Sequence, residues 1–290
     1  MLPFSGLQLA RHITGMRTNT IGVLIAGLDP FYLPFLRGIE GVANSMQFLT
    51  MICNTEDNPV KAKIQINQLI AHGVDGIIAA SVGNLVEEAF GSGEPEPLLP
   101  VVYCDQPDLE GHSILFDAEN AGYLATKHLL EHGHKRIGLV SAPVDWPNMS
   151  EYFVGYRRAL AEQGLHPNPA WMGITNDFSI TQGEVAANRL LARPDRPTAI
   201  IATADILAFG VLRAAKELGM RVPQDLAVIG YTDIELAALV EPPLTSVAAP
   251  VQEMGRLAME ILARLIKGEN VTPMTQRLET QLIIRKSCGC

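Results

Sequence analysis

Blocks of apolar and polar positions alternate along the chain, and residues 196–233 show the pattern most fully. An apolar run over 198–203 ends near a lone acid, Asp205, and a second apolar run covers 226–229. Between the two runs, apolar residues recur at helical spacing, at Leu207, Val211, Leu212, Ala215 and Leu218. A strand, a helix and a strand joined by short connections predict two parallel strands in a sheet that is covered on both faces.

The same alternation runs from end to end and begins again after about residue 117. We expect strands over 21–25, 48–52, 76–80, 101–104, 114–116, 136–141, 198–203, 226–229 and 281–284. We expect helices over 34–47, 58–73, 118–133, 151–164, 182–192, 207–218 and 251–267. Two such series predict an α/β fold of two doubly wound parallel-sheet lobes with a ligand cleft between them. The backbone is expected to cross between the lobes near Asp117 and to return near Val247.

Composition narrows the class of protein. The chain has 290 residues, of which 48% are hydrophobic and 18% charged, as in a globular protein large enough for two lobes. A net charge of −9 does not suit a surface that wraps nucleic acid, although a small basic module could be hidden in that total. The four cysteines form no C-x-x-C pair, which fits a reducing compartment. With no signal-peptide core and no apolar stretch of ~18 residues, we expect a cytoplasmic protein without a membrane span.

Nine short segments, taken in order, resemble one known family. They are TNTIGVL (18–24), DPFY (29–32), VDGII (74–78), GHKRIG (133–138), GYRRAL (155–160), RPTAI (196–200), VPQD (222–225), PPLTS (242–246) and MGRLA (254–258). Over nearly all of residues 9–290, the chain resembles the effector-binding core of LacI/GalR (lactose-repressor type) transcriptional regulators. The resemblance implies a periplasmic-binding-protein-like fold of type I with three crossovers, a small effector in the cleft, and a homodimer. It also implies a hinge remnant at 1–19, an N-terminal lobe of 20–117 plus 248–276, and a C-terminal lobe of 118–247 plus 277–290.

The N-terminal residues resemble the hinge that joins such cores to a DNA-binding head. Leu9, Ala10 and Arg11 are followed by a polar segment over 14–20. In the family this hinge is a helix that places its leucine in the minor groove, and Leu9 matches that position. The helix-turn-helix that precedes the hinge in the family is absent, so we expect either a truncated chain or a headless relative. Operator DNA would then be bound only through a head that this chain lacks.

The resemblance also marks residues of the expected cleft. Phe31 or Tyr32 after the first strand, and Phe178, match aromatic positions that stack on the effector in the family, with core packing as the alternative. Asp105 matches an acceptor for ligand hydroxyls or amines, unless it caps a turn. Asp205 matches an acid at the mouth of the cleft, which would either contact the ligand or cap the following helix.

Three positions depart from the family pattern. Tyr152 stands where the family usually has an arginine, and tyrosine cannot bind paired hydroxyls or a carboxylate bidentately. Thr232 replaces the first acid of the usual Gly-Tyr-Asp-Asp turn; the adjacent Asp233 is kept as a ligand-binding candidate that would compensate, unless its position directs it elsewhere. Trp146 lies in a loop that often carries polar ligand contacts. We therefore expect a neutral, ring-shaped or partly apolar effector.

Other chemistry is less favoured. His128, Glu131 and His132 match the H-x-x-E-H zinc-peptidase pattern, but the family uses this segment as an ordinary lobe helix, so we expect no metal. The tail Cys288-Gly-Cys290 offers a weak metal or redox site, yet a flexible terminus is the simpler expectation. With no hydrolase, kinase or dinucleotide motif, we expect no enzyme and no cofactor. The alternative function, a solute-binding protein of a sugar transport system, shares the fold but needs export.

Overall fold

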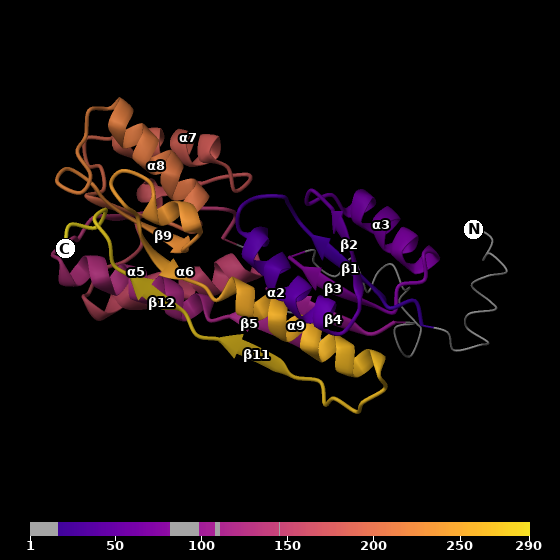
Figure 1. Cartoon of the computed structure of the whole chain (residues 1–290). Helices are drawn as coiled ribbons and strands as arrows, with labels where there is room; N and C mark the ends of the chain where they lie inside the picture. The colour runs from indigo at the N-terminus through magenta and orange to yellow at the C-terminus, as the bar shows by residue number, and fades with distance from the viewer. Residues whose placement is uncertain (1–16, 82–98, 108–110, 145) are drawn as a thin grey trace. The chain divides into compact units, whose positions relative to one another are not determined.

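The computed structural model describes residues 17–81, 99–107, 111–144 and 146–290 (Figure 1). The expected hinge residues Leu9, Ala10 and Arg11 lie outside the described residues. The chain divides into two compact units. Unit 1 holds the described residues up to Leu115 together with Val251–Arg277, and unit 2 holds Phe116–Pro250 with Leu278–Cys290. The backbone therefore passes three times from one unit to the other, as the α/β fold with two parallel-sheet lobes requires.

Unit 1 is built on a sheet with the strand order β11-β5-β4-β3-β1-β2. Its strands are β1 (Thr20–Ile25), β2 (Leu49–Asn54), β3 (Gly76–Ala80), β4 (Val101–Cys104), β5 (His112–Phe116) and β11 (Thr275–Leu278). The pairs β1–β2, β1–β3, β3–β4 and β4–β5 are all parallel. Its described helices are α2 (Tyr32–Ser45), α3 (Pro59–Ala71) and α9 (Val251–Ile266). Because β1 and β3 are buried almost throughout, their residues form continuous apolar runs.

Helices α2 and α9 of unit 1 pack with their backbones in close contact. A Cβ added at Gly38 would lie 2.1 Å from the Gln252 carbonyl oxygen. A Cβ added at Gly255 would likewise lie 2.1 Å from the Phe35 carbonyl oxygen. Real Cβ atoms do not approach so closely, so both helices need glycine at the crossing. This crossing joins the N-terminal part of the chain to the segment that returns after residue 250.

Unit 2 is built on a second sheet, with the strand order β12-β10-β9-β8-β6-β7. Its strands are β6 (Ile137–Ser141), β7 (Met172–Ile174), β8 (Ala199–Ala202), β9 (Ala227–Thr232), β10 (Thr245–Ala248) and β12 (Gln281–Ile283). The pairs β6–β7, β6–β8, β8–β9 and β9–β10 are parallel, whereas β10–β12 is antiparallel. The helices are α5 (Ala118–Glu131), α6 (Pro147–Glu162), α7 (Ile180–Leu191) and α8 (Asp205–Glu217), with short 3-10 turns η1 (Pro169–Trp171) and η2 (Glu235–Ala238).

Three strands were not expected from the sequence: β7, β10 and β11. Each has only three or four residues, which is too short for a periodic signal to stand out. β11 is also largely polar and exposed, so its place in the sheet follows from pairing rather than from burial. Helix α6 begins at Pro147, four residues before the expected start, because proline is well suited to the first turn of a helix.

The core of unit 2 forms between its sheet and helices α7 and α8. Val140, Ile200 and Val228 from three neighbouring strands pack with Leu207 and Val211 from α8, all of them fully buried. Each such side chain contributes about 1.5–3 kcal/mol by leaving water. The apolar stripe seen in the sequence of α8 is thus the face that fixes the helix against the sheet, with its first residue, Asp205, at the carboxyl end of β8.

Among the described residues, no helix is both long enough and apolar enough to cross a lipid bilayer.

Candidate functional site

The carboxyl ends of the unit 1 strands bring several polar side chains to one edge of the sheet. Asp29 and Tyr32 follow β1, Ser81 follows β3, and Asp105 follows β4. Parallel strands place these ends together, which is where ligands bind in sheets of this kind. Tyr32 is 5% exposed, and burial and the nearby Asp29 raise the pKa of its hydroxyl, which also interacts with Ser81. The structure therefore places Tyr32 mainly in the core.

Phe31 remains the more accessible aromatic of this edge. Its ring is half-buried and stands edge-on to Tyr32, with 5.0 Å between the ring centroids. Its backbone N–H donates a 2.9 Å hydrogen bond to Oδ1 of Asp29. Of the two aromatic residues proposed from the sequence, Phe31 is thus the one whose ring a ligand could contact, whereas Tyr32 is buried and packs against Phe31.

The acids of the unit 1 edge sit in an unusual backbone and electrostatic setting. Burial raises the pKa of Asp29, and burial together with the charge on Asp29 raises that of Asp57. Ser81, Asp105 and Asp57 all have positive φ, at 54°, 57° and 51°. Such strained residues concentrate where the surrounding structure has a reason to hold them. Sequence reasoning missed Asp29 and Ser81, although Ser81 directly follows a predicted strand and Asp29 lies in the loop after another.

In unit 2, two aromatic side chains meet at the corresponding edge. Trp146 follows β6 and immediately precedes α6, while Phe178 lies between β7 and α7. Their ring centroids are 6.0 Å apart at an interplanar angle of 60°, and both side chains are half-buried. The structure thus brings together two residues that the sequence placed in the site separately. A ring face in such a pair is an apolar surface on which a ring-shaped ligand can pack.

Tyr152 lies in the interior of the same unit. It is fully buried, and its ring centroid is 5.2 Å from that of Tyr231. Its hydroxyl has no hydrogen-bond partner among the described residues, and burial, together with the charge on Asp205, raises its pKa. Leaving a buried hydroxyl unsatisfied costs about 1–3 kcal/mol, so such a group in a native protein needs a reason.

Asp205 is held by hydrogen bonds from two other segments of unit 2. It is 1% exposed; its Oδ2 accepts from the Ile234 N–H at 2.8 Å and its Oδ1 from the Ser246 hydroxyl at 2.6 Å. Burial is the main cause that raises its pKa, to about 7. The expectation that it caps the following helix is wrong, because these donors belong to the segments after β9 and in β10. A Cβ at Gly230 would lie 2.1 Å from Oδ1, so this arrangement also requires that glycine.

Asp233 is neutralised by an arginine that sequence reasoning missed. Arg285 donates to its two carboxylate oxygens at 2.6 and 3.2 Å, and also to the Leu244 carbonyl at 2.7 Å. The Asp233 N–H donates to the Ser246 hydroxyl at 3.2 Å. Thr232 and Asp233 have positive φ, at 99° and 54°. Arg285 follows the last predicted strand and no motif marked it, whereas Ser246 lies within the segment 242–246 that had already been singled out.

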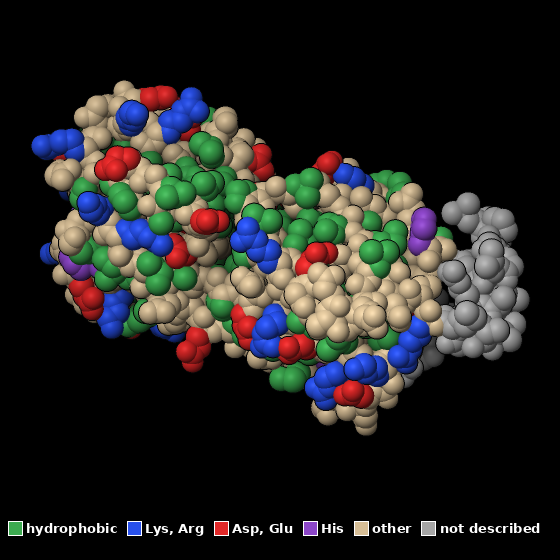
Figure 2. Space-filling model, in the orientation of Figure 1, with side chains coloured by type: hydrophobic (Ala, Val, Ile, Leu, Met, Phe, Trp, Pro, Cys, Tyr) green, Lys and Arg blue, Asp and Glu red, His purple; other side chains and the backbone are tan. Residues whose placement is uncertain are grey.

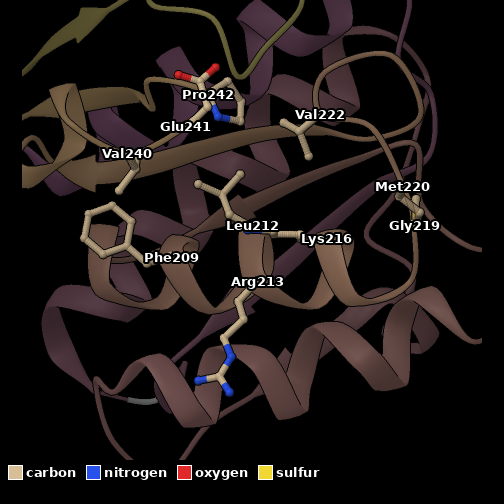
Figure 3. Close-up of a pocket in the computed structure, with 10 residues that line it drawn as sticks. All are labelled: Phe209, Leu212, Arg213, Lys216, Gly219, Met220, Val222, Val240, Glu241 and Pro242. Carbon is tan, nitrogen blue, oxygen red and sulfur yellow. The ribbon is translucent and has the colours of Figure 1, made fainter.

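An open hollow of about 500 Å³ lies elsewhere in unit 2, beside α8 (Figure 3). Its apolar wall includes Phe209, Leu212 and Val240, and Arg213 and Lys216 add positive charge. None of the site residues predicted from the sequence lines it. The hollow is therefore a separate surface feature, and the candidate site remains at the carboxyl ends of the strands.

Comparison of the sequence and the fold with known proteins shows which proteins this chain resembles. Residues 126–288 match the family model described as a periplasmic binding protein-like domain. A repressor named PurR from Aliivibrio salmonicida is 32% identical over 289 residues, covering 99% of this chain and 86% of that protein. A solved structure of the regulator CelR with cellobiose superposes with a TM-score of 0.85 at 28% identity, covering 97% of this chain and 89% of that one. A LacI family regulator from Enterococcus faecium with bound ribose has a TM-score of 0.83 at 30% identity, covering 93% and 98%.

The fold and the family match thus place the chain in the periplasmic-binding-protein-like class. Within that class, the relatives are regulators of transcription rather than transport proteins. The chain belongs to the LacI/GalR family of transcriptional regulators, of which it spans the effector-binding core.

Proposed function

We propose that this chain senses a small, neutral, ring-shaped effector and couples its binding to DNA affinity. The aromatic contacts of the effector would be Phe31, Trp146 and Phe178. Binding would favour one of two conformations of the protein, and the segment that contains Leu9, Ala10 and Arg11 would pass that preference to operator DNA. A ligand shifts such an equilibrium only through its different affinity for the two states.

The observation that supports a neutral effector is the state of the acids in unit 2. Asp233 is already paired with Arg285, and Asp205 is buried with both oxygens engaged. Neither carboxylate is therefore presented as a charge to a cation, and the Arg285 fork is occupied rather than available to an anion. What this edge offers instead is the Trp146–Phe178 pair.

Two solved relatives support the same chemistry by analogy. One is described with cellobiose and the other with ribose, and both are neutral ring sugars. This chain differs from the usual family pattern at Tyr152 and Thr232. A ligand with fewer hydroxyls, or with an apolar ring, suits those two replacements better than a highly hydroxylated sugar.

A thermal-shift screen followed by titration calorimetry tests the proposal. The panel would contain neutral sugars, nucleosides, small aromatics and sugar phosphates, because a ligand that binds only the folded protein raises its melting temperature. We expect a neutral ring compound to bind best and the Trp146→Ala variant to bind it about tenfold more weakly. Phe153→Ala is the matched control, since Phe153 stacks on Tyr156 within the same unit. Tight binding of sugar phosphates alone would refute the neutral effector.

We further propose that a second copy of the chain pairs through unit 1. The edge strand β2 and helix α3 expose Leu49, Ile52, Val60 and Ile64, and hydrophobic side chains are visible on the surface in Figure 2. Exposed apolar residues gathered in this way mark interaction surfaces. Light scattering should show a dimer for the parent chain and a monomer for Val60→Glu/Ile64→Glu. Leu218→Glu, at an exposed leucine of unit 2, should leave the mass unchanged. A dimer that survives the double change would contradict this assignment.

A further inference from the structure

The C-terminal tail of the chain is anchored, contrary to the flexible end expected from the sequence. The Ser287 hydroxyl donates to the Val228 carbonyl at 2.6 Å and accepts from the Thr245 N–H at 2.8 Å. The Val228 N–H donates to the Ser287 carbonyl at 2.8 Å. Cys288, the next residue, is 2% exposed and accepts a hydrogen bond from the Thr245 hydroxyl at 3.1 Å. The tail therefore has a fixed place beside β9 and β10.

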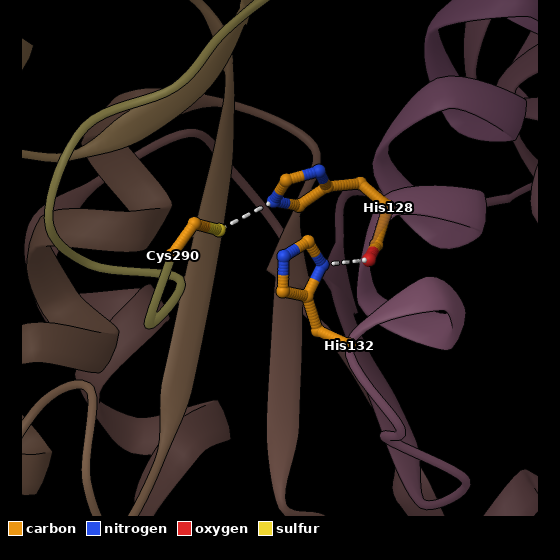
Figure 4. A group of neighbouring side chains, drawn as sticks. All are labelled: His128, His132 and Cys290. Carbon is orange, nitrogen blue, oxygen red and sulfur yellow. Dashed lines mark hydrogen bonds between the residues drawn. The ribbon is translucent and has the colours of Figure 1, made fainter.

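This fixed tail brings the Cys290 thiol to two histidines of α5 (Figure 4), and the Cys288 thiol lies beside that of Cys290. His128 and His132 are one helical turn apart, and their ring centroids are separated by 4.4 Å. Nε2 of His128 lies 3.0 Å from Sγ of Cys290, which in turn lies 2.8 Å from Sγ of Cys288. One donor atom from each of His128, His132 and Cys290 falls within 4.8 Å of the other two. All four residues belong to unit 2.

One histidine is already oriented as a metal ligand would be. Nδ1 of His132 lies 2.7 Å from the His128 carbonyl oxygen, and a carbonyl only accepts hydrogen bonds, so Nδ1 carries the proton. In the neutral ring, Nε2 of His132 then keeps a lone pair. Histidines that bind metals commonly donate their second N–H to a backbone carbonyl, which fixes the tautomer and the ring orientation.

We propose that His128, His132, Cys288 and Cys290 bind one zinc-class divalent ion. Two imidazole nitrogens and two thiolates form a donor set that zinc binds tetrahedrally. With bonds of about 2.3 Å to sulfur and about 2.0–2.1 Å to nitrogen, tetrahedral ligands stand about 3.3–3.8 Å apart. The 2.8 Å between the two Sγ atoms and the 3.0 Å between Nε2 of His128 and Sγ of Cys290 are shorter than this by less than about 1 Å. Rotation of the exposed Cys290 side chain provides that movement.

The site differs from the peptidase pattern that the sequence suggested. Glu131, the acid of the H-x-x-E-H motif, forms a 4.0 Å ion pair with Lys127 on the exposed side of α5 and has no part in the donor group. Four protein donors leave no open position for water, which is the mark of a structural rather than a catalytic site. The ion would join α5 to the tail. Because Arg285 lies three residues before Cys288, the bound ion would also stabilise the segment through which Arg285 pairs with Asp233.

Cobalt(II) titration of the full, reduced chain tests the proposal. The protein is freed of metal with a chelator, kept under a thiol-free reductant, and titrated with Co²⁺ and then with Zn²⁺. We expect one Co²⁺ per chain, with the intense visible absorption of a tetrahedral site and a thiolate-to-cobalt charge-transfer band, both abolished by one equivalent of Zn²⁺. Absence of these bands would overturn the proposal. So would a Cys288–Cys290 disulfide that persists in the reductant, detected by thiol titration.

Single substitutions assign the ligands. His132→Ala and Cys290→Ser change exposed residues, so both variants should fold, as circular dichroism would verify. Each should lower the Zn²⁺ affinity at least about 100-fold, the upper range seen when only a supporting residue of a metal site is removed. His134→Ala is the matched control, because His134 faces Thr198 at 3.0 Å and should leave affinity unchanged. Unchanged affinity in His132→Ala and Cys290→Ser would show that any metal binds elsewhere.

Discussion

The carboxyl-terminal edges of the two sheets both present acids, but they hold them in different ways. In unit 1, burial raises the pKa of Asp29, and burial together with the charge on Asp29 raises that of Asp57; the Asp29 side chain accepts a hydrogen bond from the nearby Phe31 N–H. In unit 2, Asp205 and Asp233 bond to residues 12 or more positions away, including Ser246 and Arg285. The acids of unit 2 therefore fix the ends of β9 and β10, and serve as framework.

This contrast changes which acids are good candidates for ligand contact. A mostly buried carboxylate whose two oxygens each accept a hydrogen bond from the fold is held by the fold rather than presented to a ligand. Asp205 and Asp233 both reach that state, although sequence reasoning had placed both in the site. The unit 1 acids are less constrained by distant segments. We therefore expect substitutions of the unit 2 acids mainly to lower stability, and substitutions of the unit 1 acids mainly to lower ligand affinity.

The largest effect should come from Asp205→Ala. The change removes the acceptor of the Ile234 N–H and of the Ser246 hydroxyl inside the core. Two buried donors left without partners should lower the free energy of unfolding by about 2–4 kcal/mol, measured by urea denaturation. Asp29→Ala is the comparison from unit 1 and should cost less than about 1.5 kcal/mol, because it breaks one local hydrogen bond. Equal losses from the two variants would show that the two edges do not differ as described.

A smaller effect should follow from Arg285→Ala. Asp233 and Arg285 are both mostly buried, with side chains 17% and 20% exposed. Removing the guanidinium leaves a carboxylate of low exposure without its partner, and the loss should be about 1–3 kcal/mol after discounting for the remaining solvent contact. Arg221→Ala is the matched control, since Arg221 pairs with Asp225 at the surface and should cost less than about 1 kcal/mol. A loss at Arg285 no greater than that at Arg221 would contradict a framework role.

The pH dependence of stability separates the two edges by a different measurement. Burial raises the pKa of Asp205 to about 7, above its unfolded value. Between about pH 4 and pH 7 the folded state therefore binds more protons than the unfolded state, and stability falls as pH rises through this range. Asp205→Asn, which keeps an acceptor but cannot titrate, should flatten the decline. Asp29→Asn should flatten the decline less, because the pKa of Asp29 is also raised but this residue is less buried than Asp205. An unchanged profile in Asp205→Asn would place the titration elsewhere.

The fold was largely predictable from the sequence, because its signals are local. Long apolar runs such as 21–25 and 76–80 match buried parallel strands, and the apolar stripe after Asp205 matches α8. The strands that escaped prediction have only three or four residues, and β11 is also largely polar. Their conformation comes from hydrogen bonding to a neighbouring strand that is distant in the sequence, which a local pattern does not contain.

The site was predictable only in part, for a related reason. Comparison with the family pattern marked Trp146 and Phe178 as candidate site residues but did not show that their rings meet. The partners of Asp205 and Asp233 come from segments that the sequence does not connect to them, so neither Ser246 nor Arg285 was named. The chain end was misjudged in the same way. Its burial depends on Ser287 bonding to Val228, a contact between residues far apart in the chain.

The smallest expected change in stability, and the most specific test of the ligand edge, comes from Tyr152→Phe. The hydroxyl has no partner among the described residues, so its loss should change stability by less than about 1 kcal/mol or raise it slightly. Tyr156→Phe is the control, because the Tyr156 hydroxyl donates to the Ile137 carbonyl at 2.8 Å and should cost about 1 kcal/mol. If the Tyr152 hydroxyl serves the effector, Tyr152→Phe should also weaken binding of the best compound from the screen about tenfold. Stability and affinity both unchanged would leave the hydroxyl without a role at this edge, and would assign ligand contact to Trp146 and Phe178 alone.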